Sequence, residues 1–231
     1  MAGADAQAGF YYQNLIAAEY ALELIDFGSL LRTLTFENPD RAKHIDDIIA
    51  ESTTGTVFIQ VKWAQDETAA FTLANLVTPE DNAPSLLAKL AKGFRHVFAV
   101  QGDKEIILQS TRRAGTNRQP KQGFDRSLGE FISEFHEPFV AATEVMDIQR
   151  TAAFATYEPI LRRLLADSGL TDLDEFSRFL KCLRFRLAEP SRDALRDRVR
   201  ARMTRLGIEN VQFGTLLDEV VQWSFTGRTV R

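Results

Sequence analysis

Short apolar runs separated by turn residues dominate the first part of the chain and predict β-strands. One run covers residues 45–49 and another covers residues 58–63, with the turn-rich segment 51–56 between them. This order predicts a hairpin. Side chains alternate between the two faces of a strand. One face of the second run carries Val57, Ile59 and Val61, and the other carries Phe58, Gln60 and Lys62.

Helical spacing of apolar residues predicts helices on both sides of this hairpin. The predicted helices cover residues 10–27, 86–94, 157–167, 172–187, 190–206 and 210–225, with two or three more stretches over 128–155. Further strands are predicted over 30–37, 97–101 and 106–109. From Tyr157 the chain is predicted to be wholly helical. We therefore expect an α/β core over residues 1–150 and a helical bundle subdomain over 151–231.

Composition narrows the class of protein. The 231 residues suit one large domain or a domain with a smaller companion. The single cysteine, Cys182, allows no internal disulfide, which fits a cytoplasmic protein. No signal peptide is visible, and no apolar stretch is long enough to span a membrane. Zinc clusters and nucleotide phosphate loops are also absent from the sequence.

The predicted hairpin brings a carboxylate, an amide and a lysine to one place. Gln60 and Lys62 project from the same face of the second strand, and Asp47 in the first strand can lie beside them. A carboxylate with an amide oxygen and a main-chain carbonyl, such as that of Val61, can hold a hard divalent cation. A lysine can orient water or stabilise charge on a phosphate. These are the parts needed to hydrolyse a phosphodiester.

Asp47, twelve further residues and then Gln60-Val61-Lys62 resemble the PD-(D/E)xK nuclease signature in its D…QxK variant. Asp46 stands where that family often has proline, and Gln60 replaces the usual Asp or Glu, which removes one negative charge. The segment Ala8 to Gln13 resembles the Gly-Phe-x-Tyr-Gln opening of double-stranded-DNA nuclease domains in bacterial anti-phage effectors. Together the two motifs cover roughly the first 65 residues.

This resemblance implies a restriction-endonuclease-like mixed sheet flanked by helices and a Mg²⁺- or Mn²⁺-dependent endonuclease that cuts double-stranded DNA. Asp47, Gln60 and the Val61 carbonyl would hold the metal, and Lys62 would assist the attacking water. The resemblance also implies a homo-oligomer activated by assembly, with a sensing or NTPase module in the same or another chain.

The first helix often sends one polar side chain to the metal in this family. Gln13 is the first candidate for that position and Glu19 the second, with solvated helix positions as the alternative for both and for Glu23. Glu37, at the end of the first predicted strand, is either a further ligand or a plain strand-end carboxylate. Asp46 is a weaker candidate than Asp47, and Lys62 has the alternative role of a strand-edge lysine.

Two basic segments are candidates for contact with phosphates. Net charge is −4, but it divides into −7 over residues 1–150 (14 basic and 21 acidic residues) and +3 over 151–231 (14 and 11). The loop 112–123 carries Arg112, Arg113, Arg118 and Lys121, and the helix 190–206 carries Arg196 and Arg200 among six arginines. DNA binding is one interpretation of both segments. The alternative is a solvated surface for the loop, and a solvated face or a contact with another domain for the helix.

Two rival functions share the same fold. One is a catalytically silent nuclease-like module for assembly or DNA binding, which the loss of the second carboxylate at Gln60 favours. The other is an RNase, because Asp47, Gln60 and Lys62 would act on the phosphate group, which is common to DNA and RNA, and not on the sugar.

Overall fold

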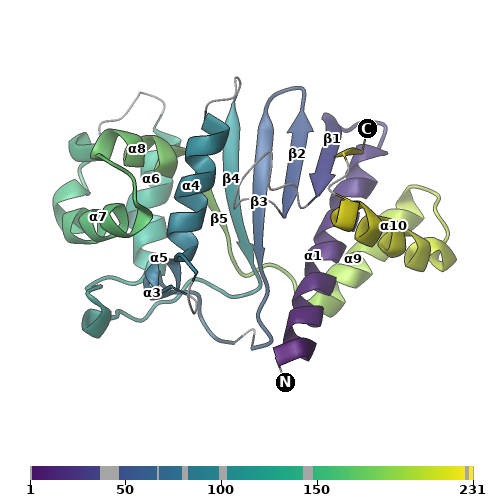
Figure 1. Cartoon of the computed structure of the whole chain (residues 1–231), viewed down its shortest axis with the longest axis horizontal. Helices are drawn as coiled ribbons and strands as arrows, with labels where there is room; N and C mark the ends of the chain where they lie inside the picture. The colour runs from purple at the N-terminus through teal and green to yellow at the C-terminus, as the bar shows by residue number, and fades with distance from the viewer. Residues whose placement is uncertain are drawn as a thin grey trace.

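The computed structural model describes residues 2–36, 47–66, 68–79, 83–98, 103–142, 148–226 and 229–230. It contains a six-stranded mixed sheet in the order β5-β4-β3-β2-β1-β6, with helices packed on both faces (Figure 1). The predicted α/β class, with a mixed sheet flanked by helices, is confirmed. Within these ranges, every helix is either too short or too polar to cross a bilayer.

Helix α1 (Ala2–Leu24) precedes three antiparallel strands, β1 (Leu31–Phe36), β2 (Ile48–Ser52) and β3 (Thr56–Lys62). The predicted hairpin is therefore present. Its register pairs Ile48 with Ile59, which sets the preceding residue Asp47 beside the end of β3. Gly55 fits the turn because a Cβ there would lie 2.7 Å from the carbonyl oxygen of Asp103.

A parallel crossover follows the hairpin. The chain runs through α3 (Leu73–Val77) and α4 (Leu86–Phe98) into β4 (Lys104–Ser110), which pairs with β3 in parallel. The strand predicted over residues 97–101 is wrong at its start, because Val97 belongs to α4; residues 99–101 lie outside the described ranges. Buried Leu90, Phe94 and Val97 continue the helical spacing, so this short apolar run is the end of a helix.

Each face of the sheet has its own apolar core. One core lies between the sheet and α3, α4 and the later helices α7 and α8, and it includes Phe58 of β3. The other lies between the sheet and α1, α9 and α10, and it includes Ile59 and Val61. Adjacent residues of β3 thus enter opposite cores, as the predicted alternation requires.

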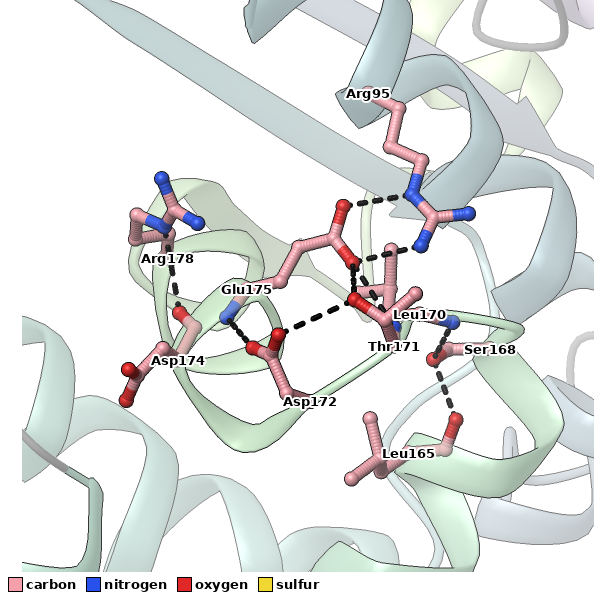
Figure 2. A network of polar contacts seen from close by, with 9 residues as sticks. All are labelled: Arg95, Leu165, Ser168, Leu170, Thr171, Asp172, Asp174, Glu175 and Arg178. Atoms are coloured by element: carbon pink, nitrogen blue, oxygen red, sulfur yellow. Dashed lines mark hydrogen bonds and ion pairs between the residues drawn. The ribbon is translucent and has the colours of Figure 1, made fainter.

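The chain after β4 contributes helices to both faces of the sheet. A short 3-10 turn η1 (Pro120–Gln122) leads into α5 (Leu128–Glu130), the π-helical turn η2 (Phe131–His136), α6 (Glu137–Ala141) and a second 3-10 turn η3 (Ile148–Arg150). Helices α7 (Phe154–Ser168) and α8 (Leu173–Cys182) then pack beside α4 (Figure 1). There, Arg95 of α4 and Glu175 of α8 form an ion pair with two hydrogen bonds (Figure 2).

The C-terminal segment is not wholly helical, which corrects the sequence prediction. The helix expected over 172–187 ends at Cys182, and β5 (Leu183–Arg186) pairs in parallel with β4. Buried Leu183 suits either structure, but pairing with the open edge of β4 favours the strand. The two-residue strand β6 (Thr229–Val230) joins the opposite edge.

Helices α9 (Arg192–Arg205) and α10 (Phe213–Thr226), joined through η4 (Asn210–Gln212), lie beside α1 on the second face (Figure 1). Both predicted parts of the chain thus contribute strands to one sheet. The division into domains near residue 150 stays a prediction.

Candidate active site at the carboxyl ends of the central strands

Asp47 and Gln60 are in direct contact at the end of β3. Asp47 directly precedes β2, and its Oδ2 accepts hydrogen bonds from Nε2 of Gln60 and from the main-chain N–H of Val61, the latter at 2.6 Å. The Gln60 side chain is buried, with its residue only 8% exposed. A buried amide needs a partner, and the carboxylate of Asp47 provides one. The predicted meeting of Asp47 and Gln60 is therefore present.

Lys62 lies on the same face of β3 as Gln60. Phe58, two residues before Gln60, enters the core beneath α4, so strand alternation directs Gln60 and Lys62 toward that side. The Lys62 carbonyl accepts a hydrogen bond of 2.7 Å from Oγ of Ser110, which is fully buried at the end of β4. This bond holds the two strand ends together. In open α/β sheets, ligands bind outside the carboxyl ends of parallel strands, and Lys62 stands at such an end.

A pocket of about 190 Å³ opens beside Lys62 on this face. Its lining comes from the ends of β3 and β4, from α3 and from the start of α4: Lys62, Trp63, Phe71, Asn75, Thr78, Leu86, Ser110 and Arg112. Lys62 and Arg112 supply two cations to it. The lining of the pocket therefore combines apolar side chains with two cations.

The donor set suits a hard cation with one carboxylate. Asp47 supplies the carboxylate, and Gln60 carries an amide oxygen. In a strand the N–H and C=O of one residue point to the same side, so the Val61 carbonyl faces the same strand as the N–H bonded to Asp47. Oxygen ligands of these kinds bind Mg²⁺, which often uses one or two carboxylates with substrate phosphates. Among the described residues, no three His, Cys, Asp or Glu side chains gather into a metal site.

Gln13 and Glu19 of α1 differ in their relation to this site. A Cβ placed on Gly9 would lie 4.0 Å from the Trp63 ring, so the start of α1 approaches the end of β3. Gln13 follows Gly9 by one helical turn and shares its side of the helix. Glu19 instead forms an ion pair with Arg198 of α9, at 2.6 Å.

Glu19 also lines a second pocket of about 370 Å³, with Tyr20, Glu23, Gln109, Arg186, Glu189, Arg198 and Arg202. Gln109 neighbours Leu108 of the α4-side core, so alternation turns it to the opposite face of the sheet. The structure therefore does not bring Glu19 to Lys62. Burial raises the pKa of Tyr20 in this second pocket, against the opposing effect of Arg186.

The four cations of the predicted DNA-binding loop have separate surroundings. Arg112 lines the pocket beside Lys62, while Arg113 and Lys121 are exposed. Arg118 forms an ion pair with Glu130 at 2.6 Å. Hydrogen bonding to Arg118 lowers the pKa of Glu130 to about 2, and the same contact raises the pKa of Arg118. Only Arg112 adjoins the candidate active site.

The arginines of α9 mostly contact their own chain. Arg196 forms ion pairs with Asp193 and Asp197, at 3.1 and 3.6 Å. Arg200 lies over the ring of Phe213, 4.7 Å from its centroid. These contacts give the basic helix a structural role in addition to any role in DNA binding.

Asp46 and Glu37 lie outside the described residues, so their predicted roles stay predictions. Sequence reasoning missed Trp63, Asn75 and Ser110, which the fold brings to the pocket from three elements. The only sequence signal for any of these three residues was the position of Trp63 directly after Lys62. No family model and no curated protein matches this chain.

Proposed function

We propose that this protein is a metal-dependent endonuclease that hydrolyses phosphodiester bonds of double-stranded DNA. The observation that carries the proposal is the contact of Asp47 with Gln60 and the Val61 main chain, with Lys62 on the same face of β3. The resemblance to the D…QxK nuclease signature rests on these same residues. The positively charged pocket next to them supports binding of a polyanion.

The residues divide the work of hydrolysis between them. Asp47, the Gln60 amide oxygen and the Val61 carbonyl would hold Mg²⁺ or Mn²⁺. Such an ion, when bound, lowers the pKa of a coordinated water and polarises a phosphoryl oxygen. Lys62 orients the attacking water or offsets the charge that develops on the phosphate. Burial of Gln60 and the strand-end bond from Ser110 keep these groups in fixed positions.

Bacterial anti-phage defence is the proposed setting, with homo-oligomerisation and a sensing or NTPase module as the activating partners. A nuclease that is active as a free chain would damage the DNA of its own cell. Control by assembly removes that conflict.

One observation favours a second candidate function, a catalytically silent module for assembly or DNA binding. The Oδ2 atom of Asp47 already accepts two hydrogen bonds, and these stabilise the end of the hairpin. Such a carboxylate can serve the fold alone. Calorimetric titration with Mg²⁺ and Mn²⁺ separates the candidates, because binding that Asp47→Ala abolishes supports the nuclease and absent binding supports the silent module.

Plasmid degradation at high protein concentration tests the activity directly. The native chain should cut plasmid DNA with Mg²⁺ or Mn²⁺. The cutting rate of Lys62→Ala should be at least about a hundredfold lower, and that of Lys92→Ala should equal the native rate. Lys92 is a matched control because it is exposed on α4 and is not part of the pocket lining. Equal cutting by the Lys62 variant would contradict the site. A parallel RNA substrate separates a DNase from an RNase.

If the native chain does not cut, fusion to a dimerising coiled coil tests control by assembly. Cutting that appears only in the fusion, and not in its Lys62→Ala version, supports activation by oligomerisation. A metal-binding fusion that still cuts neither DNA nor RNA would contradict the nuclease proposal.

A further inference from the structure

The pocket beside Lys62 presents hydrogen-bond donors, and no carboxylate is among its lining residues. Lys62 and Arg112 are cations. Asn75 uses its Oδ1 to accept bonds from the N–H and hydroxyl of Thr72, at 2.9 and 3.0 Å. Its NH₂ group is therefore the part that remains for a ligand. A concave surface built from donors of this kind favours an anion.

The start of α4 adds to the preference for an anion. Leu86, the first residue of this 13-residue helix, lines the pocket. Ser85 Oγ accepts from the N–H of Ala88 at 3.2 Å, one turn into the helix. A helix N-terminus carries partial positive charge and unbonded N–H groups, both of which favour anions.

The pocket on the other face provides a contrast. It is larger, at about 370 Å³, but its three arginines are matched by three glutamates among its lining residues. Arg198 and Glu19 form a close pair there, and Arg202 lies 3.8 Å from Glu23. Those charges already offset one another, so the preference for an anion belongs to the pocket beside Lys62.

We propose that the pocket beside Lys62 binds one phosphate group of the nucleic acid, adjacent to the phosphate that is cut. Arg112 and the Asn75 NH₂ group contact it, together with the start of α4. A pocket of about 190 Å³ admits a single phosphate with part of its nucleotide, and not a duplex. The identity of the ligand rests on the proposed nuclease function, but binding needs neither metal nor cleavage.

Trp63 itself reports binding. The chain has two tryptophans, and Trp223 stacks on Phe36 at 5.9 Å in the other core. Trp223→Phe therefore leaves Trp63 as the only indole. In EDTA at low salt, this chain is titrated with inorganic phosphate, a 5′-phosphorylated oligonucleotide and the same oligonucleotide without the phosphate. We expect a saturable change in emission, which Arg112→Gln weakens about tenfold.

Arg113→Gln is the matched control, since Arg113 is the exposed neighbour of Arg112 and is not among the lining residues. It should change the affinity less than about twofold. Tighter binding of the phosphorylated oligonucleotide indicates a terminal phosphate, and equal binding of both indicates an internal one. No response to any probe, or equal weakening by both arginine variants, would overturn the proposal.

Asn75→Asp keeps an oxygen that accepts from Thr72 and replaces the NH₂ group with a negative charge, so calorimetry with this variant decides the question if Arg112→Gln does not fold. We expect its affinity for the preferred probe to fall at least about tenfold, and unchanged affinity would overturn the proposal. Plasmid cutting is measured in parallel. Phosphate binding without any cutting would contradict the nuclease function and support the phosphate pocket. Cutting with no effect of Arg112→Gln on binding would contradict the pocket and support the nuclease function.

Discussion

At the residue scale, the pairing of one carboxylate with one amide sets the character of the candidate site. Asp47 Oδ2 receives an N–H from Gln60 and another from Val61. An amide can donate to a carboxylate without any metal, whereas a second carboxylate would repel it. The site with Gln60 is therefore compatible with the folded state when no cation is bound.

Gln60→Glu should make the fold depend on a divalent cation. Two carboxylates would share a buried position, which lowers the free energy of unfolding in EDTA by about 1–3 kcal/mol. Mg²⁺ should recover most of this loss, because it binds the folded state of the variant more tightly than that of the native chain. Thermal unfolding with and without Mg²⁺ measures both effects.

The exposed residue Gln122 offers the matched control. Gln122→Glu adds the same charge outside the site and should leave the Mg²⁺ response unchanged. Destabilisation of the Gln60 variant that Mg²⁺ does not relieve would contradict a metal site at Asp47.

His136 makes a second residue-scale prediction, about stability in mild acid. It is 2% exposed, and its Nε2 lies 3.2 Å from the carbonyl oxygen of Leu180. Burial lowers its pKa to about 4, from an ordinary value near 6.5. The unfolded chain therefore binds this proton first, and stability is lost as pH falls from about 6.5 to about 4, by about 3 kcal/mol at most.

Urea unfolding at pH 7 and at pH 4.5 checks this sign. In His136→Gln the loss between the two pH values should be smaller than in the native chain. His96→Gln is the control, because His96 on α4 is only partly buried. An equal loss in all three chains would assign the acid sensitivity to other groups.

At the element scale, an ion pair between α4 and α8 joins two residues that are 80 positions apart in the sequence. Arg95 donates to both carboxylate oxygens of Glu175, at 2.6 and 2.7 Å, and the N–H of Thr171 also donates to Glu175 (Figure 2). Hydrogen bonding to Arg95 lowers the pKa of Glu175 to about 2. The stabilisation from ionised Glu175 is present above its ordinary pKa near 4.5 and is lost as pH falls toward 2.

Glu175→Gln should destabilise the protein at pH 7 by about 1–2 kcal/mol, because it removes a charge-assisted pair with two hydrogen bonds. Glu158→Gln removes a more exposed pair with Arg162 within α7 and should cost less than about 0.5 kcal/mol. Midpoints of urea unfolding give both values. Equal costs would mean that the contact between α4 and α8 adds nothing beyond an ordinary surface pair.

The sequence predicted the elements whose signal is local. Turn residues and alternation predicted the hairpin of β2 and β3, and helical spacing predicted α4 and α7 close to their observed bounds. The contact of Asp47 with Gln60 followed from that hairpin alone, because adjacent antiparallel strands fix which residues meet.

Elements that depend on distant partners were not predicted. β5 continues the apolar spacing of α8, and only the edge of β4 converts it to a strand. The pocket is similar, because Trp63, Asn75 and Arg112 come from three segments whose meeting depends on the crossover. Sequence spacing within one segment holds no information about such contacts.

At the scale of the whole molecule, both parts of the chain build the same two cores. Phe94 of α4 contacts Phe179 of α8, with ring centroids 5.6 Å apart, in the first core. Phe36 of β1 stacks on Trp223 of α10 in the second. Each core would lose one of its covering layers without residues 151–231.

A chain of residues 1–150 should therefore fail to fold cooperatively. Its exposed apolar faces and the open edge of β4 would favour aggregation, and apolar burial is the main stabilising term that it would lose. Circular dichroism during urea unfolding should show a broad transition for this fragment and a sharp one for the full chain.

Addition of residues 151–231 as a separate chain is the complementary experiment. Recovery of a sharp transition on mixing would show that the two parts fold together as one unit. A sharp transition in the 1–150 fragment alone would instead establish the predicted domain boundary near residue 150, with Asp47, Gln60 and Lys62 in an autonomous domain. Either result also decides which chain length should be used for the metal and DNA measurements, because the site depends on the same sheet.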